Sequence, residues 1–217
     1  MSTTYDVREG RDAEPGVVAA VDAVRAGELV VLPTDTVYGL ATDAFSPAAV
    51  ARLLETKGRG PDMPVPVLVG SWQTLEGLAD EVTPLMHSLI EAFWPGGLTL
   101  VVTQAPSLRW ELGETRGTVA VRMPLHPVAL AVLERTGPLA VSSANRSGLP
   151  PALTAAEAAR QLGTAVQVYL DGGDITEGGG TASTIVDLTG PTPRLLRAGA
   201  VPDKELRELL PDLEPAP

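Results

Sequence analysis

The feature that most constrains the fold of this chain is the alternation of short apolar runs with segments of helical periodicity. Apolar runs at 29–32, 98–102 and 118–123 have the length and composition of buried strands. Between such runs lie segments like 15–26 and 84–93, in which apolar residues recur every three to four positions. Because helices and strands alternate throughout, the sequence predicts one α/β domain whose helices flank a mixed sheet.

The same patterns place the remaining elements. We expect further helices at 47–57, 72–80, 127–135, 155–162 and 203–210, and further strands at 67–69, 139–141, 166–170, 184–188 and 194–197. Loops are expected at 58–66 and 172–180, which are rich in glycine, and at 104–117, a polar segment that forms a loop or a lid. The domain is expected to span 1–210, followed by a proline-rich, disordered tail at 211–217.

Composition disfavours several classes of protein. The 217 residues carry a formal charge of −11, whereas a protein that grips nucleic acid through phosphates normally presents a basic face. The absence of cysteine excludes disulfides and thiolate metal sites. No run of about 18 apolar residues is present, so we predict no transmembrane helix and no membrane partner. The first 15 residues are polar and unlike a signal peptide, and a cytoplasmic location is expected.

Few residues are available for acid–base or metal chemistry. The chain has two histidines, and His87 lies in the middle of a predicted helix, where packing or surface exposure is the simpler explanation. His126 lies between prolines and is expected to shape a turn. A histidine-rich metal site is therefore not available, and any metal is expected to be Mg²⁺ that arrives with a nucleotide.

A polar cluster follows the apolar run 29–32. Pro33 ends the strand because it has no N–H to donate, and the segment 34–38 then supplies hydroxyls and a carboxylate. Ligands of open α/β sheets bind beyond the carboxyl ends of strands, so this segment is a candidate binding site. On spacing alone, a plain structural turn explains it equally well.

Cationic side chains occur in two further segments, one at the end of a predicted helix and one in a predicted strand. Lys57 and Arg59 flank a glycine at the end of a predicted helix, where they could complement the helix dipole or clamp an anion. Arg122 lies in an apolar strand, and an unpaired buried charge costs several kcal/mol, roughly. Its partner is therefore either an internal carboxylate or an anionic ligand.

A fourth cluster, Ser-Ser-Ala-Asn-Arg-Ser-Gly at 142–148, directly follows the apolar strand 139–141. These residue types also favour hydrogen-bonded turns, so a structural role is the alternative. The chain contains neither the phosphate-binding GxxxxGK[ST] loop nor GxGxxG, and it has no GxSxG elbow. No standard nucleotide or hydrolase fingerprint therefore applies.

Taken together, these clusters resemble the YrdC family, the threonylcarbamoyl-AMP synthases. The matching motifs are PTDTVYGL (33–40), KGR (57–59), FWPGGLTL (93–100), TVAVRMPLHP (118–127), SSANRSG (142–148), LDGG (170–173), ASTIVD (182–187) and RLLRAGA (194–200). They cover nearly the whole chain in the family's order and spacing. The fold that this resemblance implies is a single YrdC-like domain, with helices around a twisted mixed sheet and a large concave cavity.

The resemblance also implies an activity. Family members join L-threonine, bicarbonate and ATP, with Mg²⁺ on the nucleotide, into L-threonylcarbamoyl-adenylate and pyrophosphate. A separate tRNA threonylcarbamoyl transferase then modifies adenosine 37 of tRNA, and a strong tRNA contact by this acidic chain is not expected. Catalysis would depend mainly on positioning and charge stabilisation.

Matching the motifs residue by residue assigns roles to individual side chains. The resemblance implies Lys57 and Arg59 as catalytic residues, Thr36, Arg122 and Ser183 as L-threonine ligands, and Arg59, Thr118, Ser143, Asn145 and Arg197 as ATP ligands, with no metal held by the protein. One departure from the family is Met63, where relatives often carry a lysine, so one expected cation is missing.

Two other functions remain as alternatives. YrdC-like domains have been associated with RNA, so the chain could be a non-catalytic RNA-binding module, although its charge of −11 counts against this. YrdC-like domains also occur in larger carbamoyltransferases, but those carry extra domains or zinc-finger cysteines. Adenylate formation that depends on threonine and bicarbonate would separate these possibilities.

Overall fold

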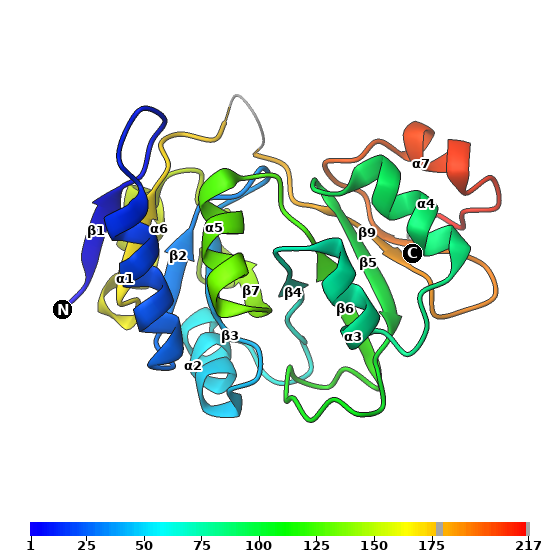
Figure 1. Cartoon of the computed structure of the whole chain (residues 1–217), viewed down its shortest axis with the longest axis horizontal. Helices are drawn as coiled ribbons and strands as arrows, with labels where there is room; N and C mark the ends of the chain where they lie inside the picture. The colour runs from blue at the N-terminus through cyan, green and yellow to red at the C-terminus, as the bar shows by residue number, and fades with distance from the viewer. Residues whose placement is uncertain (177–179, 216–217) are drawn as a thin grey trace.

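The computed structural model describes residues 1–176 and 180–215. Within them, ten strands form one mixed sheet in the order β1-β8-β2-β3-β7-β4-β6-β5-β9-β10. Helices pack on both faces of this sheet, and the chain runs from β1 at one end to the α4 and α7 side at the other (Figure 1). The predicted single α/β domain with a twisted mixed sheet is confirmed.

The sheet and its covering helices are built from short elements. The strands are β1 Thr3–Asp6, β2 Val30–Leu32, β3 Gly39–Asp43, β4 Val67–Leu68, β5 Leu98–Thr103, β6 Thr118–Arg122, β7 Leu139–Ser143, β8 Val168–Asp171, β9 Thr184–Asp187 and β10 Arg194–Arg197. The helices are α1 Glu14–Arg25, α2 Pro47–Lys57, α3 Leu75–Leu78, α4 Pro84–Phe93, α5 Pro127–Thr136, α6 Ala155–Leu162 and α7 Asp203–Leu209, with short 3₁₀ turns at Trp72–Thr74 and Gly163–Ala165.

Two strands and one helix differ from what the sequence pattern predicts. β1 lies at the sheet edge, pairs in parallel with β8 and is largely exposed, so its sequence is polar and predicts no strand. β3 also lacks a clear strand signal, because it begins directly after the polar turn, yet it pairs antiparallel with both β2 and β7. The helix expected at 72–80 is a 3₁₀ turn followed by the single turn α3.

The alternation of side chains along the strands divides the core into two layers. Val30, Leu32 and Val141 point to the face that α1 and α5 cover. Alternate residues such as Leu100 and Val121 point to the other face, in the same cluster as apolar residues of α4 and α7. Beyond α5 on the first face, strands β4, β6, β5 and β9 line a cavity. The site is therefore on a part of the sheet that none of the described helices covers.

Local chemistry fixes where two of the helices begin. Ser46 and Pro47 start α2, and the Ser46 hydroxyl accepts a hydrogen bond from the N–H of Ala49 at 3.4 Å. The predicted cap of α6 forms, because Thr154 Oγ1 accepts from the N–H of Glu157 at 3.1 Å.

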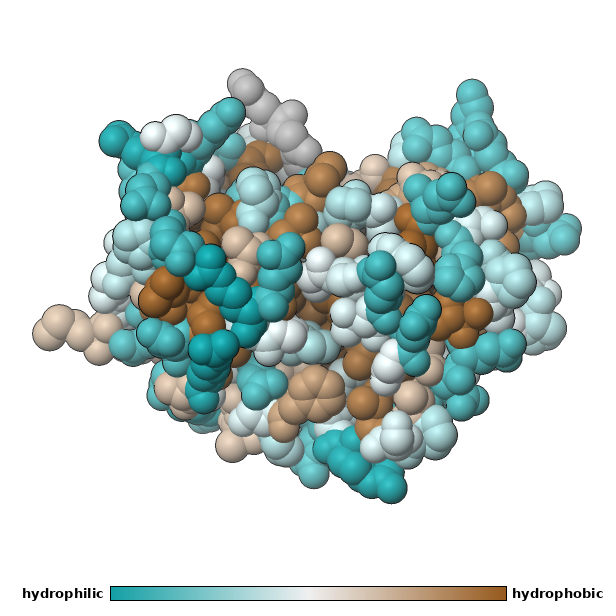
Figure 2. Space-filling view, in the orientation of Figure 1, coloured by the Kyte–Doolittle hydropathy of each residue, from teal (hydrophilic) through white to brown (hydrophobic). Residues whose placement is uncertain are grey.

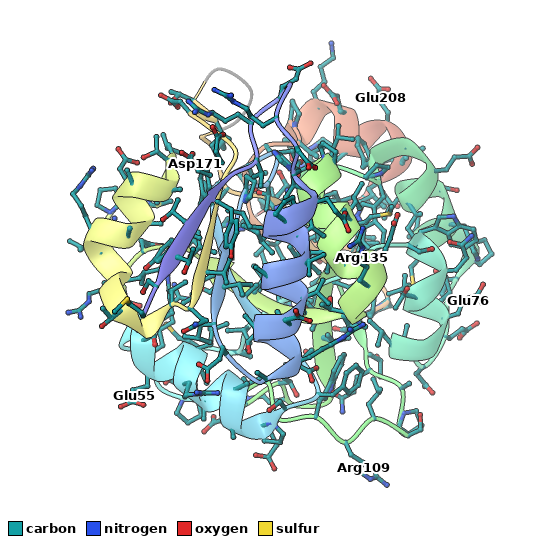
Figure 3. The ribbon with its side chains drawn as sticks, turned by 60° about the vertical axis from the view of Figure 1, so that its left-hand side comes forward. Glu55, Glu76, Arg109, Arg135, Asp171 and Glu208 are labelled. Carbon is teal, nitrogen blue, oxygen red and sulfur yellow. The ribbon has the colours of Figure 1, made fainter. Side chains whose placement is uncertain are left out.

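Helices α1 and α5 lie side by side on the front of the sheet (Figure 1). Arg135 of α5 points toward α1 (Figure 3), where both its terminal nitrogens donate to the carboxylate of Glu14 at 2.8 Å. Since these side chains are exposed, the ion pair contributes little beyond orienting the two helices.

The C-terminal segment differs from the disordered tail expected at 211–217. Leu213 is 3% exposed, and the N–H of Leu195 donates to the carbonyl of Glu214 at 2.9 Å, so this part of the segment is held beside β10. Residues 216–217 lie outside the described residues, as do 177–179 of the expected glycine loop.

The surface gives no sign of a membrane span. None of the helices in the described residues combines the length and apolar character that crossing a membrane requires. The face drawn in Figure 2 is mostly hydrophilic or intermediate, and its hydrophobic side chains occur in separate small areas.

Candidate active site

A cavity of about 330 Å³ lies on the open face of the sheet. Six of the residues expected to bind substrates line it together: Thr36, Arg59, Arg122, Ser143, Ser183 and Arg197. They come from the turn before β3, the end of α2, and strands or strand ends of β6, β7, β9 and β10. Residues more than 160 positions apart in the chain thus converge on one cavity.

Three guanidinium groups face this cavity. Arg122 pairs with a carboxylate, but within the described residues neither Arg59 nor Arg197 has an ion-pair partner. Partial burial lowers the pKa of Arg197, and the nearby charges of Arg122 and Arg59 lower it further. This mutual repulsion means that an anion entering the cavity would be attracted by all three.

The sequence left open whether the partner of Arg122 is an internal carboxylate or a ligand. In the structure, Arg122 pairs with an internal carboxylate. Its Nη2 lies 2.5 Å from Asp35 Oδ1, its Nη1 donates to Thr36 Oγ1 at 2.8 Å, and its Nε donates to the carbonyl of Gly96 at 2.8 Å. Burial lowers the pKa of Arg122, and Asp35 opposes that shift. Arg122 still lines the cavity, so it remains available to a ligand.

The polar segment after β2 is both a hydrogen-bonded turn and part of the site. Thr34 Oγ1 donates to the carbonyl of Val37 at 2.7 Å, which closes the turn. Thr36 is 1% exposed and lies on the cavity lining. Gly39 allows close packing here, because a Cβ would lie 2.9 Å from Val141 Cγ1. The segment is therefore a structural turn that also contributes to the cavity lining, so its role in binding stays a prediction.

Ser183 and Arg197 are joined by hydrogen bonds within the cavity lining. Arg197 donates from Nε to the carbonyl of Ser183 and from Nη2 to its hydroxyl, both at 2.9 Å. The Ser183 hydroxyl is also 2.8 Å from that of Thr99. Sequence reasoning missed Thr99, although it is a polar residue at an alternate position of the apolar strand β5 and so faces the cavity.

Helix α2 ends so that Arg59 reaches the site. Gly58 adopts the left-handed conformation with φ of 68°, which ends the helix and turns the chain back. Arg59 Nε then donates to Ser147 Oγ at 3.0 Å, and its Nη1 lies 3.4 Å from Ser142 Oγ. The 142–148 turn therefore holds this arginine at the cavity.

We expected Lys57 and Asn145 to contact substrates, but neither residue belongs to the lining of the cavity. Lys57 is 1% exposed, and its Nζ lies within hydrogen-bond distance of four oxygen atoms: the carbonyls of Ser143 and Asn145, Asn145 Oδ1 at 2.9 Å and Ser143 Oγ at 3.3 Å. Burial, and to a smaller degree Arg59, lowers the pKa of Lys57 to about 7. Neither side chain belongs to the cavity lining, because the oxygens of the turn surround the lysine.

Thr118 is the third expected ligand outside the lining. It shares a face of β6 with Arg122, but its hydroxyl donates to the carbonyl of Thr115 at 2.8 Å at the far end of the strand. The nearby 104–117 segment is packed rather than free. Trp110 is 8% exposed and stacks on Phe45 at a centroid distance of 5.4 Å, and Leu112 accepts a backbone hydrogen bond from Val65.

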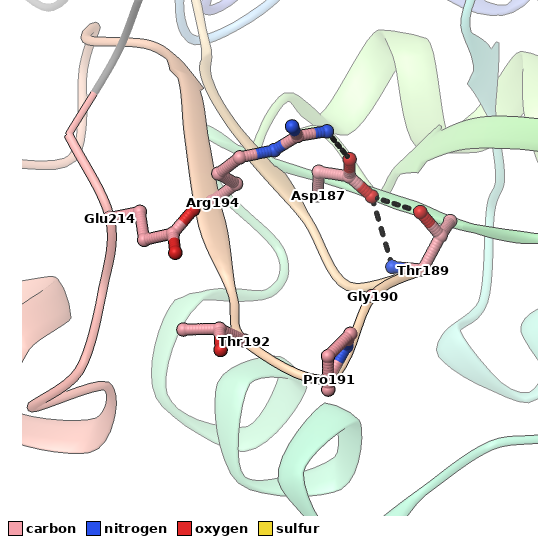
Figure 4. A pocket seen from close by; sticks show the side chains of 7 residues that line it. All are labelled: Asp187, Thr189, Gly190, Pro191, Thr192, Arg194 and Glu214. Atoms are coloured by element: carbon pink, nitrogen blue, oxygen red, sulfur yellow. Dashed lines mark hydrogen bonds and ion pairs between the residues drawn. The ribbon is translucent and has the colours of Figure 1, made fainter.

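A second hollow of about 230 Å³ lies at the turn between β9 and β10 (Figure 4). Its main polar group, Asp187, accepts hydrogen bonds from the N–H and hydroxyl of Thr189 and pairs with Arg194 at 2.9 Å. Because these groups already satisfy one another, the hollow is explained as a structural turn. The described residues contain no group of three or more His, Cys, Asp or Glu that could hold a metal ion.

A cavity on one sheet face, lined by three arginines and several hydroxyls, has the chemistry of a binding site for small anionic molecules. A family model named for Sua5, YciO and YrdC, with the description "Telomere recombination", matches residues 22–199. The chain belongs to this family, and the resemblance stated from its motifs is confirmed.

Individual relatives agree with this placement. A protein of Mycobacterium tuberculosis, provisionally named threonylcarbamoyl-AMP synthase, is 56% identical over 97% of this chain and 96% of its own length. The threonylcarbamoyl-AMP synthase of Pyrococcus abyssi is 37% identical over 98% of this chain, which spans 62% of that relative. The crystal structure of P. abyssi Sua5 complexed with L-threonine superposes with a TM-score of 0.93 at 36% identity, covering 100% of this chain and 63% of the other.

Proposed function

We propose that this protein is a threonylcarbamoyl-AMP synthase, which forms L-threonylcarbamoyl-adenylate and pyrophosphate from L-threonine, bicarbonate and ATP. The observation that carries the proposal is the convergence of Arg59, Arg122 and Arg197 on one cavity with a single carboxylate partner among the described residues. Each substrate brings a negative group, so such a site suits all three. The names of the relatives and the threonine complex of P. abyssi Sua5 support the enzyme over the RNA-binding alternative.

The reaction needs positioning more than proton transfer. The threonine nitrogen attacks carbon dioxide or bicarbonate to give a carbamate, with loss of water when bicarbonate reacts. A carbamate oxygen then attacks the α-phosphorus of ATP, and pyrophosphate leaves. The charge that develops is negative at each step, so fixed guanidinium groups in a partly enclosed cavity can stabilise it.

We assign the residues of the cavity to two adjoining subsites, which meet where Arg197 is hydrogen-bonded to Ser183. Arg122, with Thr36 and Ser183, binds L-threonine, because its guanidinium lines the cavity and suits a carboxylate. Arg59, Ser143 and Arg197 bind ATP and its phosphates. Thr118 and Asn145 would reach the nucleotide only by moving from the positions described here, so their assignment to ATP depends on that movement.

Mg²⁺ is assigned to the nucleotide rather than to the protein. The described residues offer no cluster of three acidic or histidine ligands, and Mg²⁺ commonly binds through substrate phosphates. We further propose that the product passes to a separate tRNA threonylcarbamoyl transferase in the cytoplasm. The charge of −11 argues against a strong direct contact with tRNA.

The decisive experiment is pyrophosphate release from ATP by the purified protein, with threonine and bicarbonate each present or omitted. Release that requires both is the expected result. Absence of release under every condition, from protein shown to be folded, would overturn the proposal and favour the RNA-binding module. Serine in place of threonine serves as a matched substrate control, because it keeps the carboxylate and amine and lacks one methyl group.

A further inference from the structure

We infer that Lys57 is a positioning residue, whose ammonium group fixes the 142–148 turn so that Arg59 and the serine hydroxyls face the nucleotide. The inference rests on the proposed function, which supplies the nucleotide. It also reassigns Lys57, which the motif alone placed among the reacting groups.

The contacts of α2 with the turn carry this inference. Lys57 contacts the turn with both its backbone and its side chain. Its carbonyl accepts a hydrogen bond from the N–H of Ser147 at 3.0 Å, and oxygens of Ser143 and Asn145 surround its ammonium group. Arg59 donates hydrogen bonds to the same turn, at the hydroxyls of Ser147 and Ser142. Lysine and arginine thus hold one turn from two sides.

The spacing of the KGR motif explains this division of roles. Gly58 reverses the chain with a positive φ, so the side chains before and after it take different directions. The lysine enters the interior of the turn at 1% exposure, whereas Arg59 lines the cavity. An arginine that pointed at the cavity without support would lose the fixed geometry that anion recognition needs.

Lys57 is poorly placed to touch a substrate itself. Its three ammonium protons have four protein oxygens to choose from, and it does not belong to the cavity lining. Among the described residues no carboxylate pairs with it, and Arg59 is the charged side chain that faces it. Burying an unpaired cation among neutral oxygens lowers the free energy of unfolding. We therefore attribute the presence of Lys57 to the turn that it orders rather than to stability.

A double-mutant cycle tests the inference. ATP binding is measured by calorimetry for the wild type, Lys57→Met, Arg59→Ala and the double variant. Lys57 and Lys204 are the only lysines in the chain, so Lys204→Met on the exposed face of α7 is the matched control. Circular dichroism of each variant confirms that it is folded.

We expect Lys57→Met to weaken ATP binding about 10–100-fold, by analogy with the loss caused by removing a group that orients a metal ligand. The double variant should bind more tightly than the product of the two single losses predicts, because the lysine acts partly through that arginine and partly through the serines of the turn. Losses that multiply would mean that Lys57 contacts the nucleotide independently, and the inference would be wrong. If the wild type bound no ATP, the proposed function itself would fail first.

A second measurement uses only the wild-type protein, in case Lys57→Met does not fold. With two lysines, selective isotope labelling gives two side-chain signals, and the titration of Lys57 can be followed directly by NMR. A positioning ammonium predicts that ATP affinity falls as Lys57 loses its proton. If kcat instead rose along the same titration, Lys57 would be acting as a general base, which would overturn the inference.

Discussion

Arg122 Nη2 lies 2.5 Å from Asp35 Oδ1, and this ion pair joins the end of β6 to the turn after β2. The two side chains are 7% and 16% exposed, so the pair is the most buried ion pair among the described residues. Asp35 Oδ1 also accepts from the N–H of Leu125 at 2.8 Å. The carboxylate therefore fixes the arginine that we assign to threonine and also the start of the segment leading to α5.

Asp35→Asn should lower the free energy of unfolding by about 2–3 kcal/mol, because removing one partner leaves a buried charge uncompensated. Urea unfolding measures the loss. Glu28→Gln is the control, since it removes the exposed pair with Arg52 and should cost less than about 1 kcal/mol. Saturating L-threonine should restore more stability to Asp35→Asn than to the wild type, because its carboxylate would neutralise Arg122. Equal losses from both variants would contradict the role of burial.

Arg59→Ala should reduce pyrophosphate release about 100-fold or more, the usual loss when one preorganised charge-stabilising donor is removed. Its effect on the free energy of unfolding should stay within about 1 kcal/mol, because it gives up only hydrogen bonds to two serine hydroxyls. Arg109→Ala, at an exposed loop position (Figure 3), should change neither quantity. A fully active Arg59→Ala variant would remove this residue from the phosphate site.

Stability should rise with pH above neutrality because of Lys57. Its pKa is lowered from 10.5 to about 7 on folding, so between those values the unfolded chain binds one proton that the folded protein lacks. The free energy of unfolding then increases by at most about 1.4 kcal/mol per pH unit in that window, and below pH 7 the full cost of burying the ammonium is present. Urea unfolding at pH 6.5, 8 and 9.5 measures the slope. Lys57→Met should lose this contribution, whereas Lys204→Met should keep it.

Gly199→Ala should impair both substrate sites. A Cβ at this position would lie 2.6 Å from the carbonyl carbon of Ser183, and the backbone of Ala200 donates to the carbonyl of Ala182 at 2.9 Å. The clash would push Ser183 away from Arg197, so KM for threonine and ATP should rise and stability should fall by about 1–3 kcal/mol. Gly77→Ala, which meets nothing within 4 Å, is the control. Unchanged KM values would show that the packing here can relax without moving Ser183.

Much of the fold can be predicted from the sequence because the periodicity of apolar residues is a local property. It predicted α2, α4, β5 and β6 near their observed bounds, since each must bury one face or both. The same periodicity did not predict β1, because an exposed edge strand needs no apolar face.

The sequence by itself determined the family, the elements and the small set of polar residues from which the site is made, because motifs and periodicity can be read from neighbouring positions. Only the tertiary structure decided which of them meet. Asp35 and Arg122 are 87 positions apart, and Lys57 and Asn145 are 88 apart. Whether a cation faces a cavity or is enclosed by a turn depends on the register of the strands and on the path of that turn. That is why Arg59 lines the cavity, whereas Lys57, two residues away in the same motif, is buried outside the lining.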